Sequence, residues 1–135
     1  MYIESLHYDR WVERNDVGST VAGDHLSVYA VKEAVRRLEG AERTLVTLQG
    51  PGTSHLAVGG SAATGMVVYA TFDNDTFYQL TNPEAREDVI VEVVAGGQTG
   101  DYSARMVVGL SVALQAAEEF AEGGVLSSQL AWVAS

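Results

Sequence analysis

The sequence of 135 residues contains no cysteine, which excludes disulfide bonds, thiolate zinc sites and a cysteine nucleophile. It also contains no apolar run approaching the roughly 20 residues that a membrane-spanning helix needs. Near its start, no basic segment is followed by an apolar run, so we expect no secretory signal. A chain of this length typically forms one domain. We therefore expect residues 1–135 to fold as a single cytoplasmic domain.

Basic residues are scarce in the second half of the chain. Residues 1–70 carry 8 acidic and 6 basic side chains, whereas residues 71–135 carry 10 acidic and only 2 basic ones, within a net charge of −10. This balance argues against binding to nucleic acid or to an anionic membrane surface, both of which attract Lys and Arg. It suits a basic protein partner, although the same charge is also typical of a surface that only keeps a domain soluble.

Two helices are predicted from apolar residues that recur at the three- and four-residue spacing of one helical face. The first has Asp24 or Ser27 as its candidate N-terminal cap, and its apolar positions are Val28, Val31, Ala34, Val35 and Leu38. The second begins at about Gly109 and ends at Gly123-Gly124, and its apolar positions are Ala113, Ala116, Ala117 and Phe120. Both patterns predict helices that pack one face onto a core.

Short runs of strand-forming residues, separated by turn residues, fill most of the remaining chain. Strands are predicted over residues 2–8, 43–49, 54–59, 66–72, 76–80 and 88–95, with a final strand that contains Leu130 and Trp132. The valine-rich run 88–95 predicts a largely buried strand. Tight connections favour antiparallel neighbours. The predicted fold class is therefore α+β, with a single antiparallel sheet of about six strands and two helices packed on one face.

An ordered set of motifs extends over most of the chain. A valine-rich strand is followed by Gly96-Gly97-Gln98, a helix that ends in EF-x-x-G, and a final L-x-W. Upstream, a helix, a strand, the segment HLAVGG and a further strand come in the same order. Over about residues 26–133, this arrangement resembles immunity protein family 1 of bacterial polymorphic toxin systems.

The resemblance implies a protein that binds and neutralises a cognate toxin, which in such systems is often a nucleic-acid deaminase or nuclease. Combined with the acidic composition, this role predicts that an acidic surface of the chain occludes the toxin's active site, without catalysis and without a cofactor. Glycines at the GGQ motif are expected to form a tight turn. The motif residues that we interpret as structural are Gly59, Gly60, Gly96, Gly97, Gln98, Phe120, Gly123 and Trp132.

Acidic and aromatic side chains are interleaved in the segments around residues 73–88 and 101–102, a pattern typical of protein interfaces. The candidate toxin-binding residues are Asp73, Asp75, Phe77, Tyr78, Glu84, Glu87, Asp101 and Tyr102. For each of them, a solvated loop face is the alternative interpretation. The expected partner is a basic toxin domain, with neither nucleic acid nor membrane bound, and the chain itself is expected to be a monomer or weak homodimer.

Catalytic and nucleotide-binding sites have little support in the sequence. His7, His25 and His55 lie far apart and show no metal-ligand spacing, although such groups can converge in space. The stretch Gly59 to Gly65 lacks the Lys-Ser/Thr and the following helix of a phosphate-binding loop, and we predict a hairpin loop there. We expect no catalytic, cofactor or metal residues. The alternative function is a small α+β ligand-binding or enzymatic domain, which requires a pocket with converging polar groups.

Overall fold

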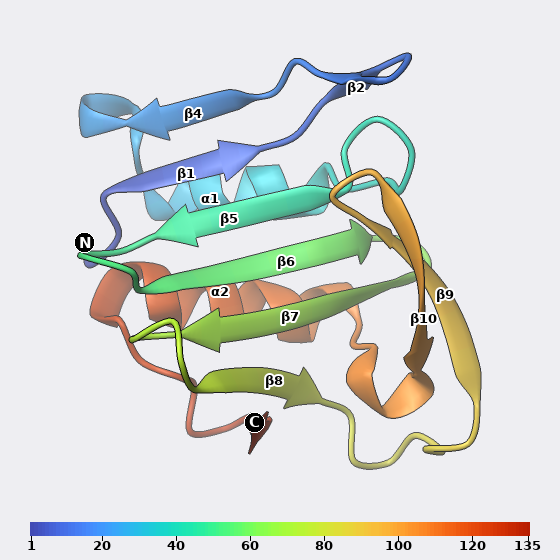
Figure 1. The fold of residues 1–135 in the computed structure, drawn as a ribbon. Coiled ribbons are helices and arrows are strands. Elements are labelled where there is room, and N and C mark those ends of the chain that lie inside the picture. The colour runs from blue at the N-terminus through green and yellow to red at the C-terminus, as the bar shows by residue number, and fades with distance from the viewer.

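The computed structural model describes residues 1–135 and is built around one antiparallel sheet of seven strands (Figure 1). Their spatial order is β11-β8-β7-β6-β5-β1-β4. In chain order they are β1 (Ser5–Tyr8), β4 (Ser19–Ala22), β5 (Leu45–Gln49), β6 (His55–Ser61), β7 (Gly65–Thr71), β8 (Phe77–Thr81) and β11 (Ala131–Ala134). Helices α1 (Val28–Arg36) and α2 (Leu110–Gly123) lie behind this sheet, so the predicted α+β class with both helices on one face is confirmed.

Two short hairpins and two 3-10 turns complete the fold. The hairpins pair β2 (Trp11–Val12) with β3 (Asn15–Asp16), and β9 (Ile90–Ala95) with β10 (Gln98–Ser103). The 3-10 turns are η1 (Gly23–His25) and η2 (Ala104–Met106). Neither α-helix combines the length and the apolar character that crossing a membrane requires.

The ends of both helices follow from local sequence. Ser27 caps α1, because its side chain accepts a hydrogen bond from the Ala30 N–H at 3.0 Å, while Asp24 lies one turn earlier in η1. Helix α2 ends at Gly123, and Gly124 follows in the left-handed conformation with φ +64°. The predicted glycine stop is therefore confirmed, and Ser27 is the cap of the two candidates.

The core lies between the sheet and the two helices. Phe120 of α2 is fully buried, and its ring lies 5.5 Å from that of Tyr2 and 5.8 Å from that of Phe72, centroid to centroid. Trp132 of β11 is partly buried and packs against the same core. Sheet residues on this face that are fully buried are Leu6, Val46, Leu48, Leu56, Val58, Met66, Val68, Ala70 and Leu80.

Strand β9 differs from its prediction. It does not join the main sheet but pairs with β10, and this hairpin crosses in front of one end of the sheet (Figure 1). Only Val93 of β9 is buried, and Ile90 is 62% exposed. The prediction of a largely buried fifth neighbour in the meander is therefore wrong. Alternating valines indicate a strand, but a two-stranded ribbon leaves one of its faces in solvent.

Candidate functional site

One face of the seven-stranded sheet has no helix on it, and it faces the viewer in Figure 1. Because strand neighbours alternate between faces, strand register identifies a row of side chains that crosses this open face. The row runs through Val133, Gln79, Tyr69, Ala57, Thr47, His7 and Thr20, one from each strand. Solvated faces of antiparallel sheets are usually polar. Here Tyr69 and Val133 are 37% and 55% exposed, so the face also presents apolar surface.

An aromatic row, which we define as His55, Tyr69 and Phe77, lies across three adjacent strands of the open face. The His55 and Tyr69 rings meet edge to face with centroids 5.6 Å apart, and Phe77 lies 5.9 Å from Tyr69. His55 Nδ1 lies 2.9 Å from the Thr53 carbonyl oxygen, so this nitrogen carries the proton and donates. Partial burial raises the pKa of the Tyr69 phenol, which therefore stays a neutral hydroxyl.

The β9–β10 hairpin forms a wall at one end of the open face. Its turn residues Gly96 and Gly97 both have positive φ, +63° and +76°, as a two-residue hairpin turn requires. Tyr102 and Ala95 point from the hairpin toward the sheet, where they line a cavity of about 230 Å³ together with Tyr69. The aromatic row therefore continues into a small apolar hollow under the wall.

A buried network, which we call the latch, holds the tip of this wall. Asp9 is 3% exposed and its carboxylate accepts hydrogen bonds from Trp11 Nε1 at 2.7 Å, Thr44 N at 2.7 Å and Leu45 N at 2.8 Å. The Thr44 hydroxyl also donates to this carboxylate and accepts the Gly97 N–H at 2.9 Å. Four donors thus compensate a buried charge and join the N-terminal segment to the hairpin.

Glycines let the hairpin approach the sheet so closely. A Cβ added at Gly59 would lie 2.5 Å from the Ala95 Cβ, and one added at Gly97 would lie 2.5 Å from the Trp11 ring. Both contacts are too short for any side chain. The VGG motif of β6 therefore lies against β9, and the turn of the GGQ motif lies against Trp11.

The family comparison covers the same motifs. The model of the family described as Immunity protein Imm1 matches residues 27–134. The chain belongs to the Imm1 immunity protein family. No curated protein and no solved structure matches it. Of the other motif residues in this Imm1 protein, Phe120 lies in the core, Gly123 ends α2, Trp132 Nε1 donates to the Ser127 carbonyl at 3.2 Å, and Gln98 is exposed at the start of β10.

The candidate contact residues of the Imm1 chain fall into two groups at opposite ends of β8. Asp73 and Asp75 lie in the turn before the strand, and Asp73 accepts the backbone N–H groups of Asp75 and Thr76, both at 2.9 Å. These donors lower the pKa of Asp73 below its usual range. Phe77 belongs to the aromatic row, whereas Tyr78 points to the helix side, where its ring lies 6.3 Å from that of Phe72.

The second group follows β8. Glu84 and Glu87 lie in the loop before β9, and Glu87 Oε2 is 3.7 Å from Arg105 Nη1. Asp101 points outward from β10, opposite Glu92 of β9, and Tyr102 points inward to the hollow. The structure therefore brings Phe77 and Tyr102 to the open face but separates Asp73 and Asp75 from the acidic residues of the wall.

Sequence reasoning missed Asp9, Thr44, His55 and Tyr69 as parts of this site. Tyr69 had one local signal, because it alternates with Met66, Val68 and Ala70 on β7 and so shares no face with the core. Asp9 and Thr44 had none, because they meet only through contacts between residues 35 positions apart in the chain.

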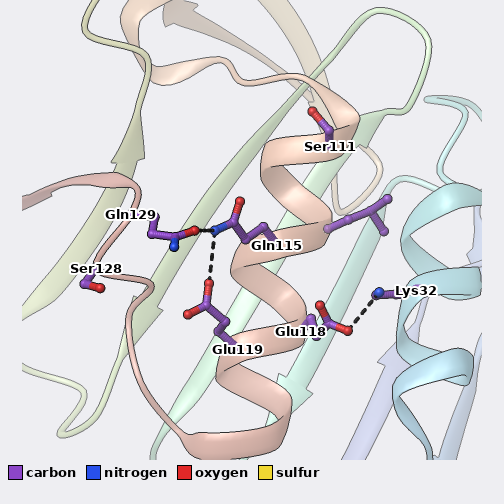
Figure 2. A pocket seen from close by; sticks show the side chains of 8 residues that line it. Lys32, Ser111, Gln115, Glu118, Glu119, Ser128 and Gln129 are labelled. Carbon is purple, nitrogen blue, oxygen red and sulfur yellow. Dashed lines mark hydrogen bonds and ion pairs between the residues drawn. The ribbon is translucent and has the colours of Figure 1, made fainter.

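The enzymatic alternative requires a pocket with converging free polar groups. The largest hollow, about 600 Å³, lies beside α2 and is mostly polar (Figure 2). Its side chains already bind one another: Lys32 pairs with Glu118 at 2.8 Å, and Gln115 donates to Gln129 at 2.7 Å and to Glu119 at 3.3 Å. No group of three or more His, Asp or Glu side chains that could hold a metal ion comes together.

Proposed function

We propose that this Imm1 protein neutralises a cognate toxin domain by binding it through the open face and the β9–β10 wall. The observation that carries the proposal is a partly exposed aromatic row on a helix-free sheet face in a member of an immunity family. Aromatic side chains anchor protein interfaces because they bury large areas with little loss of conformational entropy. Figure 1 shows that the face and its wall are presented on one side of the molecule.

Acidic residues at both borders of the open face support a basic partner. Asp75 lies in the turn that precedes Phe77, and Glu92 and Asp101 lie opposite each other on the outer side of the wall. No ion pair joins any of these three carboxylates to a basic side chain. Carboxylates so arranged raise the rate of encounter with a basic surface.

The mechanism that follows is occlusion. The toxin would be a nucleic-acid deaminase or nuclease domain, the kinds of toxin implied by the resemblance, whose substrate is held by basic residues. An acidic and aromatic surface that covers such a cleft competes directly with the nucleic acid. The chain then acts by binding alone, and neither a cofactor nor catalysis by the chain is needed.

Titration calorimetry with the toxin domain encoded beside the gene tests the aromatic row. We expect tight one-to-one binding, and we expect the double substitution Tyr69→Ala and Phe77→Ala to weaken it by about 2 kcal/mol or more, roughly thirtyfold. Tyr29→Ala is the matched control, because Tyr29 is 73% exposed but lies on α1, behind the sheet. Equal affinities for all three proteins would contradict the proposed surface, and absence of binding would contradict the function.

Association rates at two salt concentrations test the charges separately. Asp75→Lys combined with Asp101→Lys should slow association and flatten its salt dependence, because steering acts mainly on the encounter rate. Asp73 is left unchanged, since its carboxylate holds the turn. Glu122→Lys, on an exposed residue of α2, is the control. If the control slows association as much, net charge rather than this surface is responsible.

A further inference from the structure

Strand β4 is an edge that nothing in the chain covers. It pairs with β1 on one side, and its other side has no neighbouring strand. Its four residues, Ser-Thr-Val-Ala, include no charged side chain and no proline, and glycines flank it on both sides. Edge strands are usually protected by a short length, Lys, Pro, a bulge or a covering loop, and of these β4 has only its short length of four residues. An uncharged, regular edge is instead a template for pairing with another strand.

A groove runs along this edge on the helix side. It has a volume of about 240 Å³ and lies between β4 and α1, with Val21 and Ala30 on its two sides. On α1, Tyr29, Glu33 and Arg37 follow one another at four-residue spacing, so the groove extends along the helix axis. Four strand residues and eight helix residues each cover about 12–13 Å, so groove and edge have matching lengths.

The two ends of the groove carry side chains of opposite charge. Tyr29, 73% exposed, and Asp24 of η1 lie near the Ala22 end of β4, where the chain turns into α1. At the other end, Tyr8 pairs with Ser19, and the Arg43 guanidinium lies 4.6 Å from the centre of the Tyr8 ring. Arg37 lies at this same end, at the C-terminus of α1. One end is thus acidic with an exposed aromatic ring, and the other is basic.

We propose that a second copy of this chain docks on β4 by antiparallel strand addition. A two-fold axis through the edge would bring the Ala22 end of each strand beside the Ser19 end of the other. Asp24 of each copy then faces Arg37 and Arg43 of the other copy, and each Tyr29 lies at the groove of the opposite copy. The contact is self-complementary, since the same two ends meet twice.

The distribution of charge favours a second copy as the occupant, and the small area of contact makes the pair weak. The chain has a net charge of −10, but residues 10–43 hold 6 basic and 6 acidic side chains, and two of these basic residues, Arg37 and Arg43, line the groove at this edge. Two copies that meet here bring together the least acidic parts of their surfaces. A contact made by a four-residue strand and a groove of about 240 Å³ should be smaller than a standard interface of about 1,600 Å², so the dimer should form and dissociate with concentration.

Sedimentation equilibrium of the full chain tests the dimer, from about 1 μM to about 1 mM, the range that spans weak association. We expect a monomer–dimer equilibrium that Thr20→Lys weakens at least about tenfold, because lysine on an edge strand opposes pairing. Val133→Lys is the matched control, since Val133 is an exposed residue on the same face of the opposite edge strand, β11. A chain that stays monomeric throughout, or a dimer that only Val133→Lys dissociates, overturns the proposal.

A charge swap tests the two-fold arrangement itself. Asp24→Lys and Arg37→Glu should each weaken dimerisation about three- to tenfold, because each places like charges opposite one another. The double variant exchanges the charges of this pair and should recover part of the lost affinity, since the introduced lysine still faces Arg43. Additive weakening in the double variant contradicts the predicted pairing of ends. Circular dichroism of each variant confirms that a lost dimer is not a lost fold.

Discussion

The face of the sheet that α1 and α2 cover carries aliphatic side chains that solvent does not reach, whereas the open face carries Tyr69, Val133, two histidines and several polar residues that it does. Both faces belong to the same strands, so they share one backbone hydrogen-bond network. Stability should therefore depend on the covered face, because burial of apolar area is the dominant favourable term. The open face is then free to carry the residues that we propose bind the toxin.

Removing the largest side chain that is buried against the covered face should have the greatest effect. Phe120→Ala leaves a cavity under the rings of Tyr2 and Phe72, and we expect a loss of about 3–5 kcal/mol in the free energy of unfolding. Chemical denaturation monitored by fluorescence measures this loss. A loss below about 1 kcal/mol in the free energy of unfolding would contradict the idea that stability depends on the covered face.

The latch lies beside the open face, at the end of the sheet where the wall crosses it. It should nevertheless contribute strongly to stability, because it is buried. Asp9→Ala leaves the Trp11, Thr44 and Leu45 donors without their acceptor, and we expect a loss of about 2–3 kcal/mol. Hydrogen exchange of the Gly97 amide should accelerate as well. Thr47→Ala is the control, because Thr47 is a half-buried threonine of β5, the strand that begins at Leu45. This substitution should change stability far less.

The aromatic row should contribute little to folding. Tyr69→Ala removes a partly exposed ring and its contacts with His55 and Phe77, and we expect a loss of about 1 kcal/mol or less. The same denaturation experiment as for Phe120→Ala compares the two faces directly. A loss equal to that of Phe120→Ala would mean that the open face is a second core.

The smallest effect concerns pH. Backbone N–H groups lower the folded-state pKa of Asp73, so this carboxylate stabilises the turn above its unfolded pKa of about 3.9 and ceases to do so as pH falls through the lower folded value. The stability difference between wild type and Asp73→Asn should shrink as pH falls below about 4. Asp75→Asn is the control, because that side chain accepts no backbone hydrogen bond. A difference independent of pH contradicts this role.

Local pattern was enough to predict the elements that bury one periodic face. Both helices were located from apolar spacing, and six of the seven strands of the main sheet lie within predicted runs or differ from them by a few residues, the exception being β4. These elements follow a period of 3.6 or 2, which neighbouring residues determine. The class of the fold therefore followed from the sequence, and the family model agrees with the resemblance.

Pairing partners could not be predicted in the same way. The alternation in residues 88–95 is the same whether β9 joins the main sheet or forms a ribbon with β10, because a strand's period does not identify its neighbour. The aromatic row depends on the register of β6, β7 and β8. The latch joins Asp9, Thr44 and Gly97 through hydrogen bonds between residues that lie 35 and 53 positions apart in the chain. Such features follow from tertiary structure alone.

The latch also bears on the order in which the chain folds. Asp9, Trp11 and Thr44 lie in the first third of the sequence and can come together as soon as β1 pairs with β5. The Gly97 amide reaches Thr44 only after a longer loop has closed, 53 positions against 35, and a longer loop has a larger closure entropy to overcome. The tip of the wall is therefore expected to dock on the latch after Asp9, Trp11 and Thr44 have come together. The proposed binding face would then be completed later than the pairing of β1 with β5.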